Sequence, residues 1–241
     1  MLDINNIHST VLRVDHLNIG HDGRALVQDI SFELALGECV LLAGPNGTGK
    51  TTLLKWLASG AAVVLIPTNI PKVKGFTVEA FVRTGCYRES DWRGRISKEV
   101  EGRMEEALKM LGIEGLRKRD ISTLSDGEFQ KACLATGLTR KAEALLLDEP
   151  TAHLDVENRI DVLRTLREVA RKTGTAVLFS SHDLHDALQV ADRVFALTRD
   201  GRFLASGPFE KLRDPEAPVI SSEVEKSTVL RAAFPAIANL L

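Results

Sequence analysis

The feature that most constrains this chain is a stretch that fits the phosphate-binding pattern G-x-x-x-x-G-K-[ST]. Its members are Gly44, Pro45, Asn46, Gly47, Thr48, Gly49, Lys50, Thr51 and Thr52. An apolar run at 39–43 precedes it and predicts a buried strand, and residues 52–57 predict the first turns of a helix. A glycine-rich turn with a surface lysine is the alternative, but the strand-loop-helix context favours phosphate binding.

The chemistry of this loop follows from its backbone. Gly44, Gly47 and Gly49 can adopt angles that are closed to other residues. Successive N–H groups then point inward and form an anion-binding nest at a helix N-terminus. Lys50 adds a positive charge for the β- and γ-phosphates, and the Thr51 hydroxyl is placed to ligate Mg²⁺.

The elements predicted around the loop indicate an α/β fold. Strands are expected at 11–19, 30–36, 39–43, 61–66, 144–148, 176–179 and 194–197, and helices at about 49–58, 156–172 and 184–190. The first two strands predict an antiparallel edge sheet, because Ile30, Phe32, Leu34 and Leu36 recur at every second position. The later alternation of strands and helices predicts a P-loop NTPase core, with a mostly parallel sheet and helices on both faces.

The middle of the chain has a different character. From residue 68 charges become frequent and helical spacing replaces strand patterns, with Thr77 as an expected N-cap and a second helix over 97–111. We interpret 68–137 as an inserted, mostly helical subdomain within a single domain that spans 1–241. Asp155 is expected to cap the helix that follows the strand at 144–148.

Composition argues against several classes of protein. The 31 basic and 33 acidic residues nearly cancel, and the chain has few aromatic residues, so a nucleic-acid surface is not expected. Cys39, Cys86 and Cys133 are odd in number and widely spaced, which indicates neither a disulfide framework nor a zinc site. We find no signal-peptide pattern and no apolar run long enough to span a membrane, so we expect a soluble, cytoplasmic chain.

Two carboxylates and a histidine follow predicted strands at the sheet edge where open α/β sheets bind ligands. Asp148 ends an apolar strand, which is the usual setting for a second Mg²⁺ anchor. Glu149 can polarise a water beside a γ-phosphate as a general base, and His182 can donate a hydrogen bond to a γ-phosphate oxygen. A solvated acidic turn and a histidine packed in a turn are the alternatives.

A further motif precedes an apolar helix pattern and consists of Ser125, Asp126, Gly127 and Glu128. Ser125 is a good N-cap, and Glu128 follows three residues later. A capping box therefore accounts for this stretch when it is considered alone.

Taken in order, these motifs resemble the ATP-binding cassette family. The phosphate loop is followed by a helical insertion, a Leu-Ser-x-Gly-like signature, a strand that ends in Asp-Glu-Pro, a D-loop-like segment at 151–155 and a switch histidine. The resemblance covers residues 11 to about 207. It implies a head-to-tail dimer that holds two ATP molecules, each between residues 44–52 of one copy and 125–128 of the other.

The resemblance also implies a role for individual residues. By this match Lys50 binds phosphate, and Thr51 and Asp148 hold Mg²⁺. Glu149 is the catalytic base and His182 is the switch that senses the nucleotide. The helix dipoles agree with this arrangement, because both loops open helices and two positive ends face the γ-phosphate.

Three departures from the family pattern matter. The family has a glutamine after the strand at 62–66, where this chain has Thr68 and Asn69. The segment before Pro67 lacks a pair of strands that is usual in the family. Asp126 and Glu128 stand where glycine and glutamine are commoner, and their charges oppose phosphate binding unless they point away or cap the helix.

The resemblance implies the ATP-hydrolysing subunit of a membrane transporter. The start of the insertion at 76–85 looks like that of importers for iron-siderophore, haem or cobalamin. Such a subunit works as a homodimer with integral membrane permease subunits on the inner face of the cell membrane, without inserting itself. The alternative is a soluble cassette ATPase of the DNA-repair or translation type, which the missing glutamine keeps open. A small-molecule phosphotransferase has no recognisable lid or acceptor pocket.

Overall fold

The computed structural model describes residues 10–21, 24–60, 62–181 and 183–205. Its strands are β1 (Thr10–His21), β2 (Arg24–Ala35), β3 (Cys39–Ala43), β4 (Val63–Ile66), β5 (Ala144–Leu147), β6 (Ala176–Ser180), β7 (Arg193–Leu197) and β8 (Phe203–Ala205). Its α-helices are α1 (Lys50–Leu57), α2 (Val78–Arg83), α3 (Lys98–Met110), α4 (Asp126–Thr139), α5 (Val156–Thr173) and α6 (Leu184–Val190). Short 3₁₀ helices lie at Thr84–Glu89, Glu114–Leu116 and Ile121–Thr123.

The central sheet has the strand order β4-β5-β6-β3-β7-β8. The pairs among β3 to β7 are parallel, and β8 pairs with β7 in the antiparallel direction. The carboxyl ends of five strands therefore meet at one edge of the sheet, which is where open α/β sheets bind ligands. β1 and β2 form a separate antiparallel sheet, as the sequence predicted.

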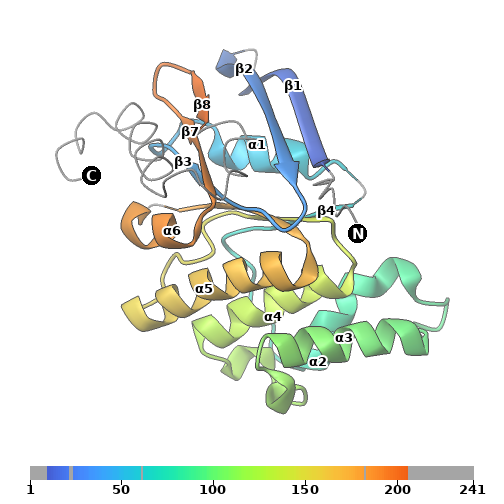
Figure 1. Ribbon diagram of the computed structural model, residues 1–241. Helices are drawn as coiled ribbons and strands as arrows, with labels where there is room; N and C mark the ends of the chain where they lie inside the picture. Colours follow the sequence, from blue (N-terminus) through green and yellow to red (C-terminus); the bar gives the residue numbers. More distant parts are fainter. Residues whose placement is uncertain (1–9, 22–23, 61, 182, 206–241) are drawn as a thin grey trace, which may run out of the picture.

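The central sheet is covered on both faces. This is shown by β3, β5, β6 and β7, which are buried along their whole length. Alternate residues of β3 point to two separate apolar clusters. Leu41 belongs to a cluster with residues of α2, α3 and α4, and Leu42 belongs to a cluster with residues of α1, β1 and β2. Figure 1 shows these layers, with α2 to α5 on one side of the sheet and β1, β2 and α1 on the other.

Several predicted details differ from the structure. The alternating burial of β2 stops one residue early: Ala35 is 6% exposed and Leu36 is 41% exposed, because the strand ends at Ala35 and a turn through Gly37 follows. The strand expected to include Asp148 ends at Leu147. The strand expected from residue 61 begins at Val63.

The helices predicted within 68–137 are present as α2, α3 and α4. Thr77, Ser97 and Asp155 cap α2, α3 and α5 through side-chain hydrogen bonds to backbone N–H groups. One apolar cluster runs from β3 into the insertion and includes Val82 of α2 and Leu108 of α3. Since the two parts share this cluster, a boundary of the insertion at 68–137 stays a prediction.

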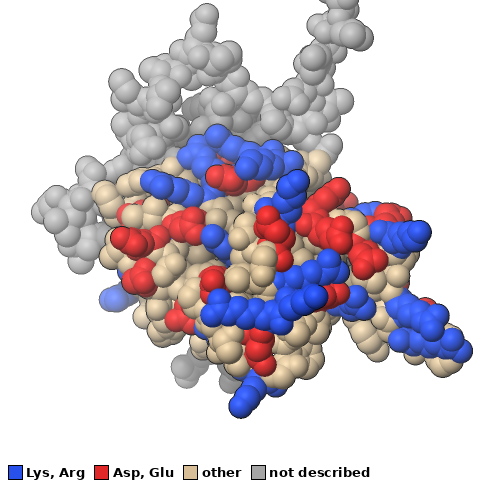
Figure 2. All heavy atoms as spheres, turned by 90° about the horizontal axis from the view of Figure 1, so that it is seen from below, with Lys and Arg blue, Asp and Glu red and all other residues tan. Residues whose placement is uncertain are grey.

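On the face seen from below, basic and acidic side chains lie among one another (Figure 2).

Candidate functional site

The loop after β3 has glycine at positions where the backbone conformation or the nearby atoms disfavour a side chain. Gly44 has φ 153°, and a Cβ there would lie 2.7 Å from the carbonyl oxygen of Leu197 and 2.8 Å from Oγ1 of Thr48. Gly49 has φ 101° and precedes α1 without a side-chain cap. The first turn of α1 contains no acidic residue, so its N–H groups and positive dipole end are not compensated by its own side chains. The loop therefore fits an anion.

Lys50 is buried beside this loop. Its Nζ donates hydrogen bonds to the carbonyl oxygens of Gly44, at 2.6 Å, and Pro45, at 3.2 Å. Burial lowers the pKa of Lys50, and the nearby carboxylates of Glu149 and Asp148 oppose that change. The ammonium group thus contacts the loop and interacts electrostatically with the two carboxylates predicted to belong to the same site.

Two oxygens meet where a divalent cation is expected. Thr51 Oγ1 donates to Oδ2 of Asp148 at 2.7 Å, although the residues are 97 positions apart. Ser180 Oγ donates to the other oxygen, Oδ1, at 2.9 Å, and accepts the N–H of Glu149 at 2.9 Å. A hydroxyl and a carboxylate are ligands that Mg²⁺ takes when phosphates complete its shell, so these residues fit the ion. Sequence reasoning missed Ser180, because its neighbours on β6 resemble any buried strand.

Glu149 adopts φ 51°, in the left-handed region that a glutamate rarely occupies. Such backbone strain clusters at functional sites. Glu149 lines a cavity of ≈ 310 Å³ together with Asn69, Asp126 and Leu154. The cavity therefore joins the carboxylate expected to act as a base to the first residue of α4.

The two residues at the position of the missing glutamine have different surroundings. Thr68 Oγ1 donates to the backbone carbonyl oxygen of Asp148 at 2.8 Å. Asn69 is exposed and lines the same cavity as Glu149. Thr68 therefore contacts the backbone of Asp148, the carboxylate predicted to hold Mg²⁺, while Asn69 lines the cavity.

The helix start at Ser125 has the predicted capping box. Ser125 Oγ accepts the N–H of Glu128 at 3.1 Å, and Oε2 of Glu128 accepts the N–H of Ser125 at 2.8 Å. Glu128 therefore caps its own helix. This is one of the two arrangements expected to keep its charge from opposing phosphate binding. Gly127 is close to Oδ1 of Asn158, which a Cβ would approach to 2.8 Å, so a larger residue there would have to displace the Asn158 side chain. His182 lies outside the described residues.

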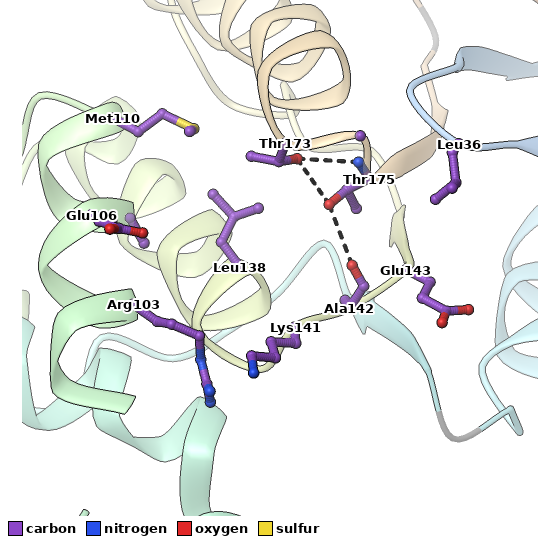
Figure 3. A pocket seen from close by; sticks show the side chains of 12 residues that line it. Leu36, Arg103, Glu106, Met110, Leu138, Lys141, Ala142, Glu143, Thr173 and Thr175 are labelled. Carbon is purple, nitrogen blue, oxygen red and sulfur yellow. Dashed lines mark hydrogen bonds between the residues drawn. The ribbon is translucent and has the colours of Figure 1, made fainter. Parts of the chain in front are cut away.

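A second cavity, of ≈ 330 Å³, lies at the opposite edge of the sheet (Figure 3). Thr175 precedes β6 and donates its hydroxyl to the carbonyl oxygen of Ala142 at 3.3 Å, just before β5. Leu36, which precedes β3, lines the same cavity. Because these residues stand at the amino ends of their strands, the cavity is separate from the phosphate loop.

The comparisons with known proteins agree with this geometry. A family model described as ABC transporter matches residues 27–152. The petrobactin import ATP-binding protein of Bacillus anthracis is 30% identical over 213 residues, which cover 78% of each chain.

The chain belongs to the ABC transporter family.

Other relatives carry similar names. The iron(3+)-hydroxamate import ATP-binding protein of Bacillus subtilis is 28% identical over 229 residues, or 85% of each chain. The phosphate import ATP-binding protein of Natronomonas pharaonis is 32% identical over 237 residues, or 85% of this chain and 83% of the relative. This ABC protein is accordingly an ATPase subunit whose hydrolysis of ATP powers transport.

A solved structure of a putative metal-chelate type ABC transporter in an inward-facing conformation shows the same fold. The TM-score is 0.77 at 23% identity, over 94% of this chain and 90% of that one. In the described part of this ABC protein, no helix has the length and apolarity needed to cross a bilayer.

Proposed function

We propose that this ABC protein is the ATPase subunit of a membrane importer of iron-siderophore, haem or cobalamin. The observation that carries the hydrolytic part is the meeting of Thr51 and Asp148 beside the glycine loop. The cargo class is supported by relatives named for petrobactin, achromobactin and iron(3+)-hydroxamate. The soluble alternative, a repair or translation ATPase, has no support in these names.

In this proposal each residue has one task. Lys50 and the N–H groups of the loop at 44–52 bind the β- and γ-phosphates, and Thr51 and Asp148 would hold Mg²⁺. The ion, when bound, neutralises charge on the β- and γ-phosphate oxygens. Glu149 orients a water for in-line attack and accepts its proton.

The proposal also requires a second copy of the chain. Ser125, Asp126, Gly127 and Glu128 open α4, and the N-terminus of that helix binds the γ-phosphate of ATP held by the partner copy. His182, by resemblance, contacts the same phosphate. The homodimer works at the inner face of the cell membrane, bound to integral permease subunits, and remains cytoplasmic itself.

The test is the Glu149→Gln variant. We expect it to bind ATP and to form a stable dimer in MgATP, because the side chain keeps its shape but cannot accept a proton. Steady-state hydrolysis should fall about 10²- to 10⁴-fold, which is the usual contribution of a general base. Dimer formation is measured by sedimentation, and hydrolysis by phosphate release.

Glu143→Gln is the matched control, since this exposed glutamate precedes the amino end of β5, whereas Glu149 follows the carboxyl end. It should hydrolyse ATP at the rate of the unchanged protein. Rapid hydrolysis by the Glu149→Gln variant would remove Glu149 from the role of base. A Glu149→Gln protein that stays monomeric in saturating MgATP, alone and with its permease, would refute the shared site.

A further inference from the structure

Lys72 lies between β4 and α2, and its ammonium group reaches the start of α4. Nζ donates a hydrogen bond to the carbonyl oxygen of Leu124 at 2.9 Å and lies 2.6 Å from Oδ1 of Asp126. It also lies 5.4 Å from the centroid of the Phe129 ring. Leu124 and Asp126 are the two neighbours of Ser125, so a single side chain holds the backbone on one side of the serine and the carboxylate on the other.

The charge at this helix start needs compensation. Asp126 and Glu128 both lie in the first turn of α4, where carboxylates offset the positive dipole end that would attract a phosphate. Glu128 is turned back into the capping box, and Nη1 of Arg119 lies 3.7 Å from its Oε1. The Asp126 side chain is 62% exposed, whereas Lys72 is 25% exposed and points to it.

The segment that carries Lys72 also begins at the other half of the site. Thr68, four positions earlier, donates its hydroxyl to the backbone of Asp148. Residues 68–72 therefore connect the magnesium-side carboxylate to the helix start at Ser125. In the two-copy arrangement these groups belong to two different ATP sites.

We propose that Lys72 is a positioning residue for the helix start at Ser125. It holds Asp126 away from the phosphate path and balances its charge, so that Ser125 and the first N–H groups of α4 can accept the γ-phosphate of ATP on the partner copy. This inference rests on the proposed function. It assigns to Lys72 the task of balancing the negative charge of Asp126. A chain with glycine at position 126 would have no such charge to balance.

The contact is tested first without nucleotide, by a double-mutant cycle of Lys72→Met and Asp126→Asn. Each single change should lower the midpoint of thermal unfolding by about 1–2 °C, and the double variant should lose no more than the larger single loss. Additive losses would mean that the two side chains do not interact, and would overturn the inference.

The functional test uses the Glu149→Gln background and measures the MgATP concentration that gives half-maximal dimer formation. Lys72→Met should raise this concentration about tenfold, because it leaves the Asp126 charge unbalanced near the phosphate. Adding Asp126→Asn should restore it to within about twofold, since the repelling charge is gone. Lys74→Met is the control for the loss of a lysine on the same segment and should have no effect.

Salt gives a readout that a merely structural role would not change. At about 1 M salt the Debye length is about 3 Å, so the defect of Lys72→Met should shrink. Normal dimer formation by Lys72→Met, or a defect that Asp126→Asn does not rescue, would overturn the inference. Failure of the Glu149→Gln parent to dimerise would refute the proposed function, and with it this role, even if the unfolding cycle shows that the two side chains interact.

Discussion

The central sheet and the helical insertion are stabilised in different ways. The strands β3, β5, β6 and β7 are buried throughout, and they are apolar except for Ser180 and Arg193. In the insertion, Arg117 lies within 4 Å of three glutamates: Glu79, Glu101 and Glu105. Every one of these side chains is at least 28% exposed. Buried apolar strands fix positions closely, whereas exposed ion pairs contribute little each and are screened by salt.

This difference matches the division of the site. The phosphate loop, Asp148 and Glu149 follow directly from buried strands, so their relative positions are set by the core. Ser125 lies within the insertion, and its neighbours Leu124 and Asp126 are held by polar contacts of Lys72. We therefore expect the half of the proposed site that would bind the chain's own nucleotide to be the more rigid half.

The largest expected effect on stability comes from an exception inside the sheet region. Glu38 and Arg193 form a buried ion pair at 3.0 Å, with side chains 3% and 6% exposed. Arg193→Met leaves Glu38 buried without its partner, so the free energy of unfolding should fall by about 3–5 kcal/mol. Denaturant unfolding measures the loss.

The same variant should also show a defined pH dependence. Burial raises the pKa of Glu38 above its ordinary 4.5, and Arg193 opposes that rise. Without Arg193 the folded state binds the proton more tightly than the unfolded chain does. The stability of Arg193→Met should therefore decrease as pH rises above about 4.5. Adding Glu38→Gln should recover part of the loss at pH 7; no recovery would contradict this account.

A change of intermediate size tests whether the two regions unfold together. Leu108 in α3 is 1% exposed and belongs to the cluster that includes Leu41 of β3. Leu108→Ala should lower the free energy of unfolding by about 2–4 kcal/mol through the cavity it leaves. Hydrogen exchange of peptides from α3 and from β5 reports on each region. Equal acceleration is expected, because the cluster is shared; faster exchange in α3 alone would show that the insertion opens independently.

The smallest effect is expected for the exposed network. Arg117→Met should cost about 1 kcal/mol, since each pair is partly solvated. The hydrogen bond from Arg117 holds the pKa of Glu79 below its ordinary 4.5. This pair therefore adds stability at pH above about 4.5 and loses it as pH falls through the lower folded-state value. Arg117→Met should weaken that acid dependence in thermal unfolding; an unchanged acid profile would contradict it.

The sequence by itself determined the elements whose signal is local. The glycine loop, the apolar strands and the caps at Thr77, Ser125 and Asp155 all follow from neighbouring residues. Turn, strand and helix patterns depend on a few consecutive side chains, so they can be recognised before folding is known. The order of the motifs was enough to indicate the family.

Only the tertiary structure decided which distant groups meet. Ser180 against Asp148, Thr68 against the Asp148 backbone, and Lys72 against Asp126 join residues that no local pattern connects. Strand order brings Ser180, Asp148 and Thr68 to one edge of the sheet, and that order depends on long-range packing rather than on propensity. The capping box of Glu128 was predicted from the sequence, whereas the contact of Lys72 with Asp126 is seen only in the folded chain.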